Sequence, residues 1–203
     1  MPHALPRIRP ARWADKHSVA ALTAEALHTQ PLGAWLVPDE HHRRRILTDV
    51  LEIWVEHALF FGEVHVTDNL TAATVTFHRY RPIPPPAAYP QRLHAAAEPN
   101  TTPFDLLEAY LHSDRPCTPH CHLATLAVSP AHQRQGLGDA LLAYHRQRLD
   151  RIGLPAMAEV PPASRRLFSR NGYIPQTEVV LPGGIRLQPM TSPGATPARP
   201  PSA

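Results

Sequence analysis

The chain has 203 residues, 43% of them hydrophobic, which is enough to bury a core in one domain or in two small ones. Its 25 prolines exclude an uninterrupted helical bundle, because proline breaks the interior of a helix. The formal charge is only +3 and is spread along the chain. The one tight basic run, residues 41–45, is interpreted as the solvated face of a helix, so we expect no nucleic-acid partner.

Cysteine content and hydropathy indicate a reducing, cytoplasmic setting. Two cysteines are too few for a disulfide framework. No apolar run reaches the roughly 18 residues that a membrane-spanning helix needs, so we expect no membrane partner. Residues 1–14 are rich in arginine and lack acidic residues, but they contain no apolar core of signal-peptide length.

The N-terminal half alternates between helical and strand patterns. Hydrophobic periodicity predicts a strand near 8–11, a helix over 15–27, a longer helix from 38 to Gly62, and a hairpin of 63–67 and 73–77. A stiff proline-rich connector at 79–90 and two short helices, near 89–97 and 104–112, follow.

The C-terminal half places helices between strands. We expect a strand over 122–128, a helix over 136–149, a strand over 156–160, a helix over 163–171, and a final hairpin of 174–181 and 185–187. This order indicates the α/β class with a mixed sheet. Residues 1–190 should form one domain. Residues 191–203 have no apolar period and should be a disordered tail.

One segment carries the pattern of a phosphate site. A strand ends at Val128, a proline turn follows, and the run from Gln133 to Gly138 opens a helix. Successive backbone N–H groups then point at one spot in front of the helix, where an anion binds. Glycine at 136 and 138 lets the anion approach closely, and Arg134 adds positive charge. The third glycine of a dinucleotide fold and the Gly-Lys-Ser/Thr of a Walker loop are both missing.

This segment, with its Gln133-x-x-Gly136-x-Gly138 run, resembles the acetyl-CoA motif of the GCN5-related N-acetyltransferases (GNAT). The run from Arg166 to Tyr173, Arg-Leu-Phe-Ser-Arg-Asn-Gly-Tyr, is similar to the family's later helix, usually written Leu-Tyr-x-x-x-Gly-Phe. The resemblance extends from Ile8 to Met190. It looks closest to the puromycin N-acetyltransferase-like branch, because three segments recur in similar form: Leu123-Ala124-Thr125, Gly153-Leu154-Pro155 and Leu181-Pro182-Gly183-Gly184 before Met190.

The resemblance implies a single GNAT-like domain. Its mixed central sheet would splay between the strands at 122–128 and 156–160, with helices on both faces and a C-terminal hairpin. Acetyl-CoA would be the co-substrate. The backbone of Leu126, Ala127 and Val128 would pair with the pantetheine arm. The pyrophosphate would be held by Gln133, Arg134, Gln135, Gly136, Leu137, Gly138 and Asp139, and Ser164 and Phe168 would flank the cofactor.

The implied reaction is direct attack of a primary amine on the thioester, with the Val128 N–H stabilising the oxyanion. Strand alternation places His122 on one face with Ala124, Leu126 and Val128. The resemblance implies a base six residues before Val128, which makes His122 the first candidate, and Glu159 is the second. The family's usual proton donor is the Tyr of the Leu-Tyr motif, but this chain has Phe168 there.

Three explanations of Phe168 stay open. The CoA thiolate can leave unaided, a neighbouring group or water can replace the tyrosine, or the chain is catalytically weak or inactive. The neighbouring candidates are Ser164, Ser169 and Tyr173.

The acceptor pocket should be built by the 28–38 loop, the connector at 79–90, the 104–113 segment and the 181–185 hairpin. Their candidate side chains are Trp35, Tyr80 and Tyr110, followed by Tyr89, Phe104, Asp105 and Glu108. Phe60 and Phe61 are expected in the core. We expect no metal, because alternation puts Cys121 and His122 on opposite sides of a strand and no further Cys/His pair follows the Cys117–His122 run at finger spacing.

The sequence therefore predicts an acetyl-CoA-dependent N-acetyltransferase, a transferase acting on a small-molecule amine such as an antibiotic or another secondary metabolite, as a monomer or homodimer. One alternative acceptor is a peptide or protein amine. The other alternative is a CoA-binding module that has lost catalysis.

Overall fold

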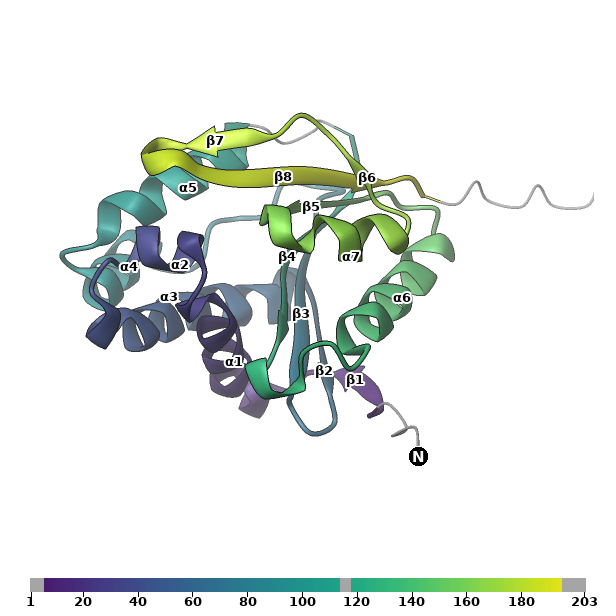
Figure 1. The fold of residues 1–203 in the computed structure, drawn as a ribbon, viewed down its shortest axis with the longest axis horizontal. Coiled ribbons are helices and arrows are strands. Elements are labelled where there is room, and N and C mark those ends of the chain that lie inside the picture. Colours follow the sequence, from purple (N-terminus) through teal and green to yellow (C-terminus); the bar gives the residue numbers. More distant parts are fainter. Residues whose placement is uncertain (1–5, 114–117, 195–203) are drawn as a thin grey trace, which may run out of the picture.

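The computed structural model describes residues 6–113 and 118–194. Figure 1 shows a central sheet with helices on both sides. The helices are α1 (Lys16–His28), α2 (Pro31–Leu36), α3 (Glu40–Phe61), α4 (Tyr89–Ala97), α5 (Thr101–Ser113), α6 (Leu137–Asp150) and α7 (Arg165–Arg170). The strands are β1 (Ile8–Pro10), β2 (Gly62–Thr67), β3 (Ala72–His78), β4 (Cys121–Val128), β5 (Ala156–Val160), β6 (Ile174–Pro175), β7 (Val179–Leu181) and β8 (Ile185–Ser192).

The sheet is mixed and splits at its centre. Its strand order is β1-β2-β3-β4-β5-β8-β6, and β7 pairs with β8 outside this path. Neighbours are antiparallel except β4 and β5, which are parallel and pair only at Cys121–Ala156 and His122–Met157. Beyond His122 the two strands diverge, so that β4 runs down the view of Figure 1 while β5 and β8 cross its top. The predicted mixed sheet, splayed between these two strands, is confirmed.

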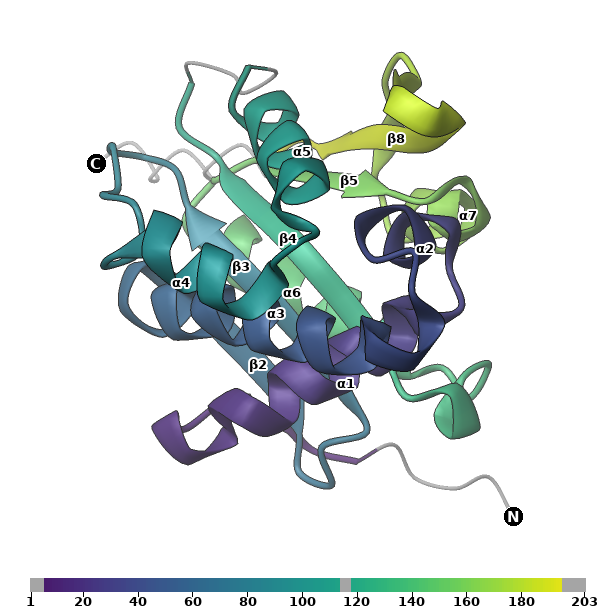
Figure 2. The ribbon, with the colours of Figure 1, turned by 90° about the vertical axis from the view of Figure 1, so that its left-hand side faces the viewer.

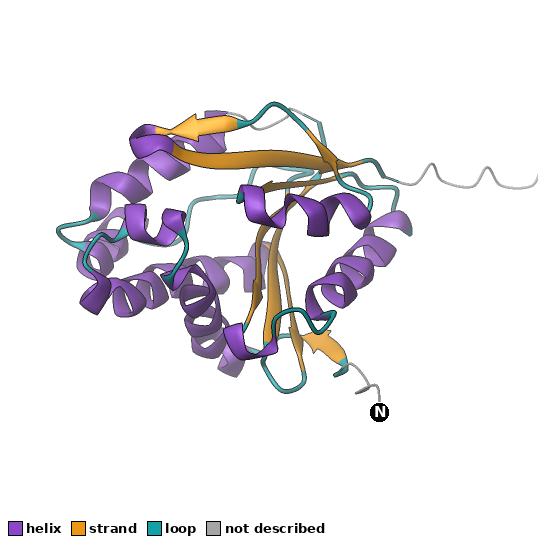
Figure 3. Ribbon diagram, viewed as in Figure 1, coloured by secondary structure: helices purple, strands orange, loops and turns teal. Residues whose placement is uncertain are grey.

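The two faces of the sheet differ in character. Figures 2 and 3 show α1 and α3 on one face and α6 on the other. Side chains of β2 and β3 that alternate toward α1 and α3 are apolar, and Val64, Val66, Val75 and Phe77 form a core with Val19 and Val55. The opposite set, toward α6, is polar and includes Glu63 and His65.

A bulge in β4 changes which residues share a face. Thr125 lies opposite Val75, but Leu123 lies opposite the next residue, Thr76, so Ala124 is the extra residue. The alternation predicted along the whole strand is therefore wrong across this point. His122 pairs with Phe77 and lies on the α1/α3 face, whereas Leu126 and Val128 pack toward α6.

Two further segments differ from the predictions. The expected loop at 28–38 contains α2, which begins at Pro31, a residue favoured in the first turn of a helix. The expected strand at 174–181 is divided into β6 and β7, while β8 is longer than predicted and reaches Ser192, past the predicted domain end at 190. The rest of the predicted tail, from residue 195, lies outside the described residues.

Two side chains are also not where the sequence predicts. Phe60 is 69% exposed and packs edge-on against Trp13, so it is not a core residue. Arg43, in the basic run assigned to a solvated face, is buried and donates hydrogen bonds to three backbone carbonyls.

Candidate active site

The edge of β4 that faces β5 is open beyond His122. The Ser129 N–H donates to the Thr71 carbonyl, so in this antiparallel ladder Ala127 and Thr125 bond to β3. By the same alternation, the N–H and C=O groups of Leu126 and Val128 point away from β3, toward the gap between β4 and β5. The open edge can therefore accept an extended chain at two residues, and Ala127 is committed to the sheet.

The loop after β4 has the backbone geometry of an anion site. Arg134 (φ +60°) and Gly136 (φ +83°) both lie in the left-handed region, and α6 begins at Leu137. This turn brings the free N–H groups at the start of α6 to one point, with the positive end of the helix dipole behind them. The Gln133 side chain donates to the Val128 carbonyl at 3.3 Å and so ties the loop to the strand.

Gly138 and Asp139 hold the start of α6 against α7. A Cβ on Gly138 would lie 3.0 Å from Leu167 Cδ2, so this glycine permits close helix packing. The Asp139 carboxylate accepts hydrogen bonds from the Arg170 Nε (2.7 Å) and the Asn171 Nδ2 (2.8 Å), and the Arg170 hydrogen bond lowers the pKa of Asp139 below its ordinary value. The loop and the helix that carries Phe168 are therefore fixed to each other.

A groove of about 820 Å³, here called the long groove, runs along this loop and the open edge. Nine of the predicted cofactor residues line it: Leu126, Val128, Gln133, Arg134, Gly136, Leu137, Gly138, Asp139 and Ser164. Ala127, Gln135 and Phe168 do not, and the Gln135 amide instead donates to the Ala131 carbonyl.

A second space of about 240 Å³, here called the inner cavity, lies between α1, α3, α5 and the splayed strands. Most of its wall is apolar. Its polar side chains are Thr23, Gln30, Arg79, Glu108, His112, His122, Thr125, Glu159 and Ser164. It adjoins the long groove at residues that line both spaces: Ala26, Gln30, Leu32, Leu126, Pro161 and Ser164.

The two candidate bases meet in the inner cavity. The His122 Nε2 lies 2.7 Å from the Glu159 Oε2, and the two side chains are only 10% and 11% exposed. An ionised carboxylate accepts, so the imidazole hydrogen lies on Nε2 and the Nδ1 lone pair remains. Nδ1 is buried and makes no hydrogen bond among the described residues. The two strands bring this pair together because β4 and β5 still pair at His122 and have begun to separate at Glu159.

Phe168 lines the inner cavity and is buried, with its ring packed edge-on against Tyr173 at 5.1 Å between centroids. Of the three groups that might replace the missing tyrosine, Ser164 lines both spaces. Ser169 is exposed, and Tyr173 lies in the core behind Phe168, where burial raises the pKa of its hydroxyl. The structure thus brings one of the three groups to the site.

The three predicted acceptor residues lie outside the two spaces. Tyr80 is 54% exposed and its ring lies tilted against that of His78, and Trp35 packs against the turn at Gly183. Tyr110 lies on α5, away from the face that lines the cavity. Phe104 and Glu108, also singled out in the sequence, do line the inner cavity, but Asp105 does not.

Sequence reasoning missed other lining residues. The 28–38 and 181–185 segments were assigned to the acceptor pocket, but the α1–α2 junction and residues 184–187 border the long groove. Leu167 and Arg170, which border it too, were not singled out for this role. On α5 the lining positions are Phe104, Leu107, Glu108, Leu111 and His112, which are spaced as one helix face. The sequence shows this spacing as the apolar face of a helix. Spacing alone, however, does not distinguish a helix face that lines a cavity from one that packs into the core.

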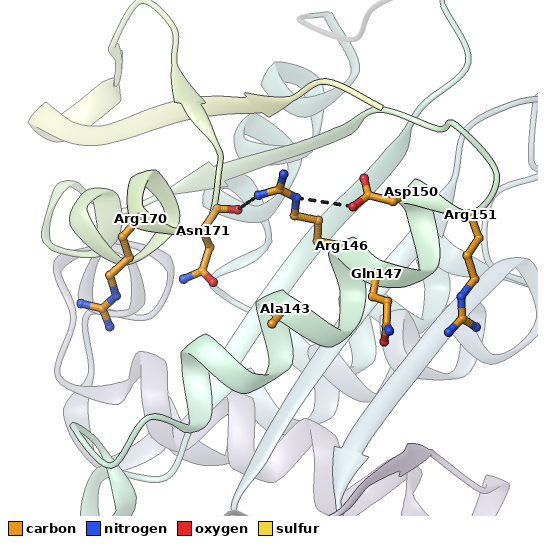
Figure 4. A pocket seen from close by; sticks show the side chains of 7 residues that line it. All are labelled: Ala143, Arg146, Gln147, Asp150, Arg151, Arg170 and Asn171. Atoms are coloured by element: carbon orange, nitrogen blue, oxygen red, sulfur yellow. Dashed lines mark hydrogen bonds and ion pairs between the residues drawn. The ribbon is translucent and has the colours of Figure 1, made fainter. Parts of the chain in front are cut away.

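A third hollow, of about 550 Å³, opens on the outer side of α6 (Figure 4). Three arginines border it, and Arg146 donates to the Asn171 carbonyl and pairs with Asp150. The hollow contains neither member of the His122–Glu159 pair, so we treat it as a surface depression.

Residues 6–113 and 118–194 contain neither a candidate metal site nor a candidate membrane-spanning helix. No group of three or more His, Cys, Asp or Glu side chains in these ranges could hold a metal ion, and Cys117 lies outside them. None of the helices in these ranges is both long enough and apolar enough to cross a bilayer. Cys121 is fully buried, and this burial raises the pKa of its thiol to about 12.

Comparison with known proteins connects this geometry to a family. The sequence model of the acetyltransferase (GNAT) domain matches residues 109–192. A solved structure of histone acetyltransferase HPA2 and related acetyltransferase from Corynebacterium glutamicum is 21% identical, with a TM-score of 0.75 over 97% of this chain and 100% of that one.

Two more distant structures have the same fold. Arylalkylamine N-acetyltransferase like 5b from mosquito is 14% identical, with a TM-score of 0.56 over 92% and 99% of the two chains. PaiA N-acetyltransferase from Thermoplasma acidophilum, solved in complex with coenzyme A, is 10% identical, with a TM-score of 0.53 over 92% and 98%. The chain therefore has the fold of the GNAT N-acetyltransferases, and its residues 109–192 match the model of their acetyltransferase domain.

Proposed function

We propose that this protein transfers the acetyl group of acetyl-CoA to the primary amine of a small molecule by direct attack. One observation carries the proposal. The long groove, which suits an extended cofactor with a pyrophosphate, meets a small inner cavity that holds a buried His122–Glu159 pair. A groove for the donor and a cavity for the acceptor, joined at one point, are what a direct transfer needs.

The long groove fits coenzyme A. Bound acetyl-CoA supplies a thioester that activates the acetyl group. The open edge at Leu126 and Val128 offers backbone groups to the pantetheine arm, and the left-handed turn at Arg134 and Gly136 offers N–H groups to the pyrophosphate. The PaiA relative, of the same fold, was solved with coenzyme A.

The His122–Glu159 pair is assigned to removing a proton from the incoming ammonium. The imidazole receives the proton, directly or through water, and the Glu159 carboxylate fixes the ring and stabilises the imidazolium. An amine enters the cavity as a cation, and the cavity attracts it: two carboxylates, Glu108 and Glu159, face one guanidinium, Arg79.

The open edge also serves the second half of the reaction. The Val128 N–H points into the gap and is assigned to the oxyanion. As the C–N bond forms and the C–S bond breaks, the nitrogen releases its second proton to water. With Phe168 in place of tyrosine, CoA leaves as its thiolate, which a thiol of pKa about 8.5 permits near neutral pH. The Ser164 hydroxyl, where the two spaces meet, donates a hydrogen bond to it.

Two alternatives remain distinct from this proposal. A peptide or protein amine is the acceptor that the C. glutamicum relative's name suggests for that protein, and Phe168 is the residue that favours a CoA-binding module without catalysis. A cavity of about 240 Å³ favours the small amine. It is also smaller than the roughly 300–1,000 Å³ of drug-sized sites, so an antibiotic of puromycin size fits less well. The puromycin-like branch, the cytoplasmic setting and the monomer or homodimer stay predictions.

Release of free CoA thiol from acetyl-CoA, measured with a panel of amines, tests the reaction. Turnover with at least one small amine is expected, and tight acetyl-CoA binding without release by any amine would contradict it. His122→Ala should lower kcat about a hundredfold or more and remove the pair's limb of the pH–rate profile. His120→Ala, which deletes a buried imidazole outside both spaces, should not change the shape of that profile.

The roles of Glu159 and Ser164 have their own variants. Glu159→Gln keeps the shape of the side chain but removes its charge, so it should lower kcat more than it changes the KM for the amine. Ser164→Ala should lower kcat by about tenfold, the loss of one hydrogen bond to a charged group, while Ser169→Ala should leave it unchanged. Equal effects of the two serine variants would remove Ser164 from the mechanism.

A further inference from the structure

We propose that the acceptor is a compact amine with an apolar, ring-sized body, and that helix α5 is the wall that selects it. The inference rests on the acetyl transfer proposed above and names the substrate class of the same site. It follows from which side chains α5 turns into the inner cavity, from the size of that cavity and from the distribution of charge around it.

One face of α5 forms a wall of the inner cavity. Phe104, Leu107 and Leu111 come from successive turns of the helix and all line the cavity, whereas Leu106, between them in sequence, is exposed. The wall thus presents apolar side chains over two turns, with Glu108 and His112 beside them on the same face. In Figure 2, α5 lies over the N-terminal half of β4, the strand that carries His122.

The wall opposite α5 is apolar and aromatic. The Trp54 ring of α3 packs edge-on against Phe77 (6.0 Å between centroids) and Tyr89 (5.1 Å), and Trp54 and Phe77 both line the cavity. Burying hydrocarbon between two such surfaces is favourable in proportion to the apolar area removed from water. The body of the acceptor is therefore bound by apolar contact.

The volume limits that body. About 240 Å³ lies below the roughly 300–1,000 Å³ of sites that bind drug-sized ligands, so the cavity favours a compact acceptor over a peptide segment. A peptide would also need partners for its backbone groups, and the cavity wall offers few polar atoms.

The charges limit the acceptor to one cationic head. Arg79 and Glu108 both line the cavity and offset each other, and Glu108 also accepts a hydrogen bond from the Tyr89 hydroxyl. The other carboxylate, Glu159, which accepts a hydrogen bond from His122, is two residues from Pro161, where the cavity adjoins the long groove. An ammonium placed there lies beside the donor, and a second ammonium would be left against apolar walls, at a high cost in desolvation.

Specificity constants for a panel of amines test the inference. 2-Phenylethylamine and hexylamine should exceed 1,4-diaminobutane and a lysine-containing peptide by a hundredfold or more in kcat/KM. A preference for the diamine or the peptide would overturn the inference while leaving acetyl transfer standing. No thiol release with any amine would instead contradict the proposed function. If no thiol is released, calorimetric titration with 2-phenylethylamine in the absence of acetyl-CoA still tests whether the inner cavity binds an amine of this class.

Variants of α5 assign the selection to the wall. Leu111→Ala enlarges the cavity and should raise the kcat/KM ratio of 3,3-diphenylpropylamine over 2-phenylethylamine by tenfold or more. Leu111→Phe fills the cavity and should lower that ratio and raise the KM for 2-phenylethylamine. Leu106→Ala removes the same side chain from the exposed face and should change neither. If both Leu111 variants fold, as judged by circular dichroism, but have the same kcat/KM ratio as Leu106→Ala, the wall does not select the acceptor. If one Leu111 variant fails to fold, the ratio of the other variant decides the question.

Discussion

Arg43 joins two segments of backbone that border the acceptor side of the fold. Its guanidinium donates to the carbonyls of Val37 (2.7 Å), His28 (2.9 Å) and Pro38 (2.9 Å). The His28 carbonyl belongs to the last turn of α1, where helix carbonyls lack partners. One buried side chain therefore satisfies the end of α1 and the turn into α3.

Removing this guanidinium should cost stability. Arg43→Ala leaves three carbonyls without their donor and should lower the free energy of unfolding by about 3 kcal/mol in urea titrations. Arg44→Ala, one residue along the same helix but exposed, is the matched control and should change it by less than about 0.5 kcal/mol. Equal losses in the two variants would show that Arg43 acts only through helix propensity.

At the scale of elements, α6 carries a glycine in the left-handed region at each end. Gly136 (φ +83°) begins the helix beside the long groove, and Gly153 (φ +64°) follows its C-terminus, outside the groove. Alanine at either position puts a Cβ into a conformation that costs about 1–2 kcal/mol. The two substitutions therefore impose similar strain in different places.

This pair separates binding from stability. Gly136→Ala should raise the KM for acetyl-CoA by about tenfold, because it displaces the N–H groups at the start of α6. Gly153→Ala should lower the melting temperature to a similar extent as Gly136→Ala but leave the KM for acetyl-CoA unchanged. The KM comes from initial rates and the melting temperature from thermal unfolding. An increase in KM with both variants would mean that global strain, not the loop, governs cofactor binding.

The elements themselves were predictable because each has a local signal. Proline, glycine and the change of hydrophobic period mark nearly every boundary, from Gly62 after α3 to Pro130 after β4. The bulge at Ala124 has no such signal: it is set by how β3 and β4 register, so alternation placed His122 on the wrong face. The His122–Glu159 contact was equally hidden, because it depends on where two strands separate. The lining face of α5 was visible only as an apolar stripe.

At the scale of the whole molecule, the two faces of the sheet bury different kinds of side chain. The α1/α3 face holds the apolar core and the inner cavity, while the α6 face buries titratable groups. On that second face His145 of α6 is only 2% exposed and lies near Glu63, His65, His78 and Arg148. Burial is the main cause that lowers the pKa of His145 to about 4, and it also lowers the pKa of His65. The folded chain therefore keeps these imidazoles neutral.

This arrangement predicts that stability falls in mild acid. The unfolded chain binds a proton at His145 near pH 6.5, whereas the folded chain does so only near pH 4. Between these values the unfolded state holds more protons, so the contribution of His145 is fully present above pH 6.5 and is lost as the pH falls. The loss amounts to about 2 kcal/mol by pH 5 and about 3 kcal/mol by pH 4.

Replacing His145 with leucine tests whether this residue causes the acid sensitivity. The Nε2 of His145 makes no hydrogen bond among the described residues, so an apolar side chain of similar size leaves no polar group unsatisfied. Urea titrations at pH 7.5 and pH 5 should show a smaller loss of unfolding free energy for His145→Leu than for the unmodified chain, by about 2 kcal/mol. The remaining loss belongs to His65 and to the other groups of the α6 face. An exposed imidazole, removed in His94→Ala, should leave the difference between the two pH values unchanged. If His145→Leu has the pH dependence of the unmodified chain, the acid sensitivity arises elsewhere.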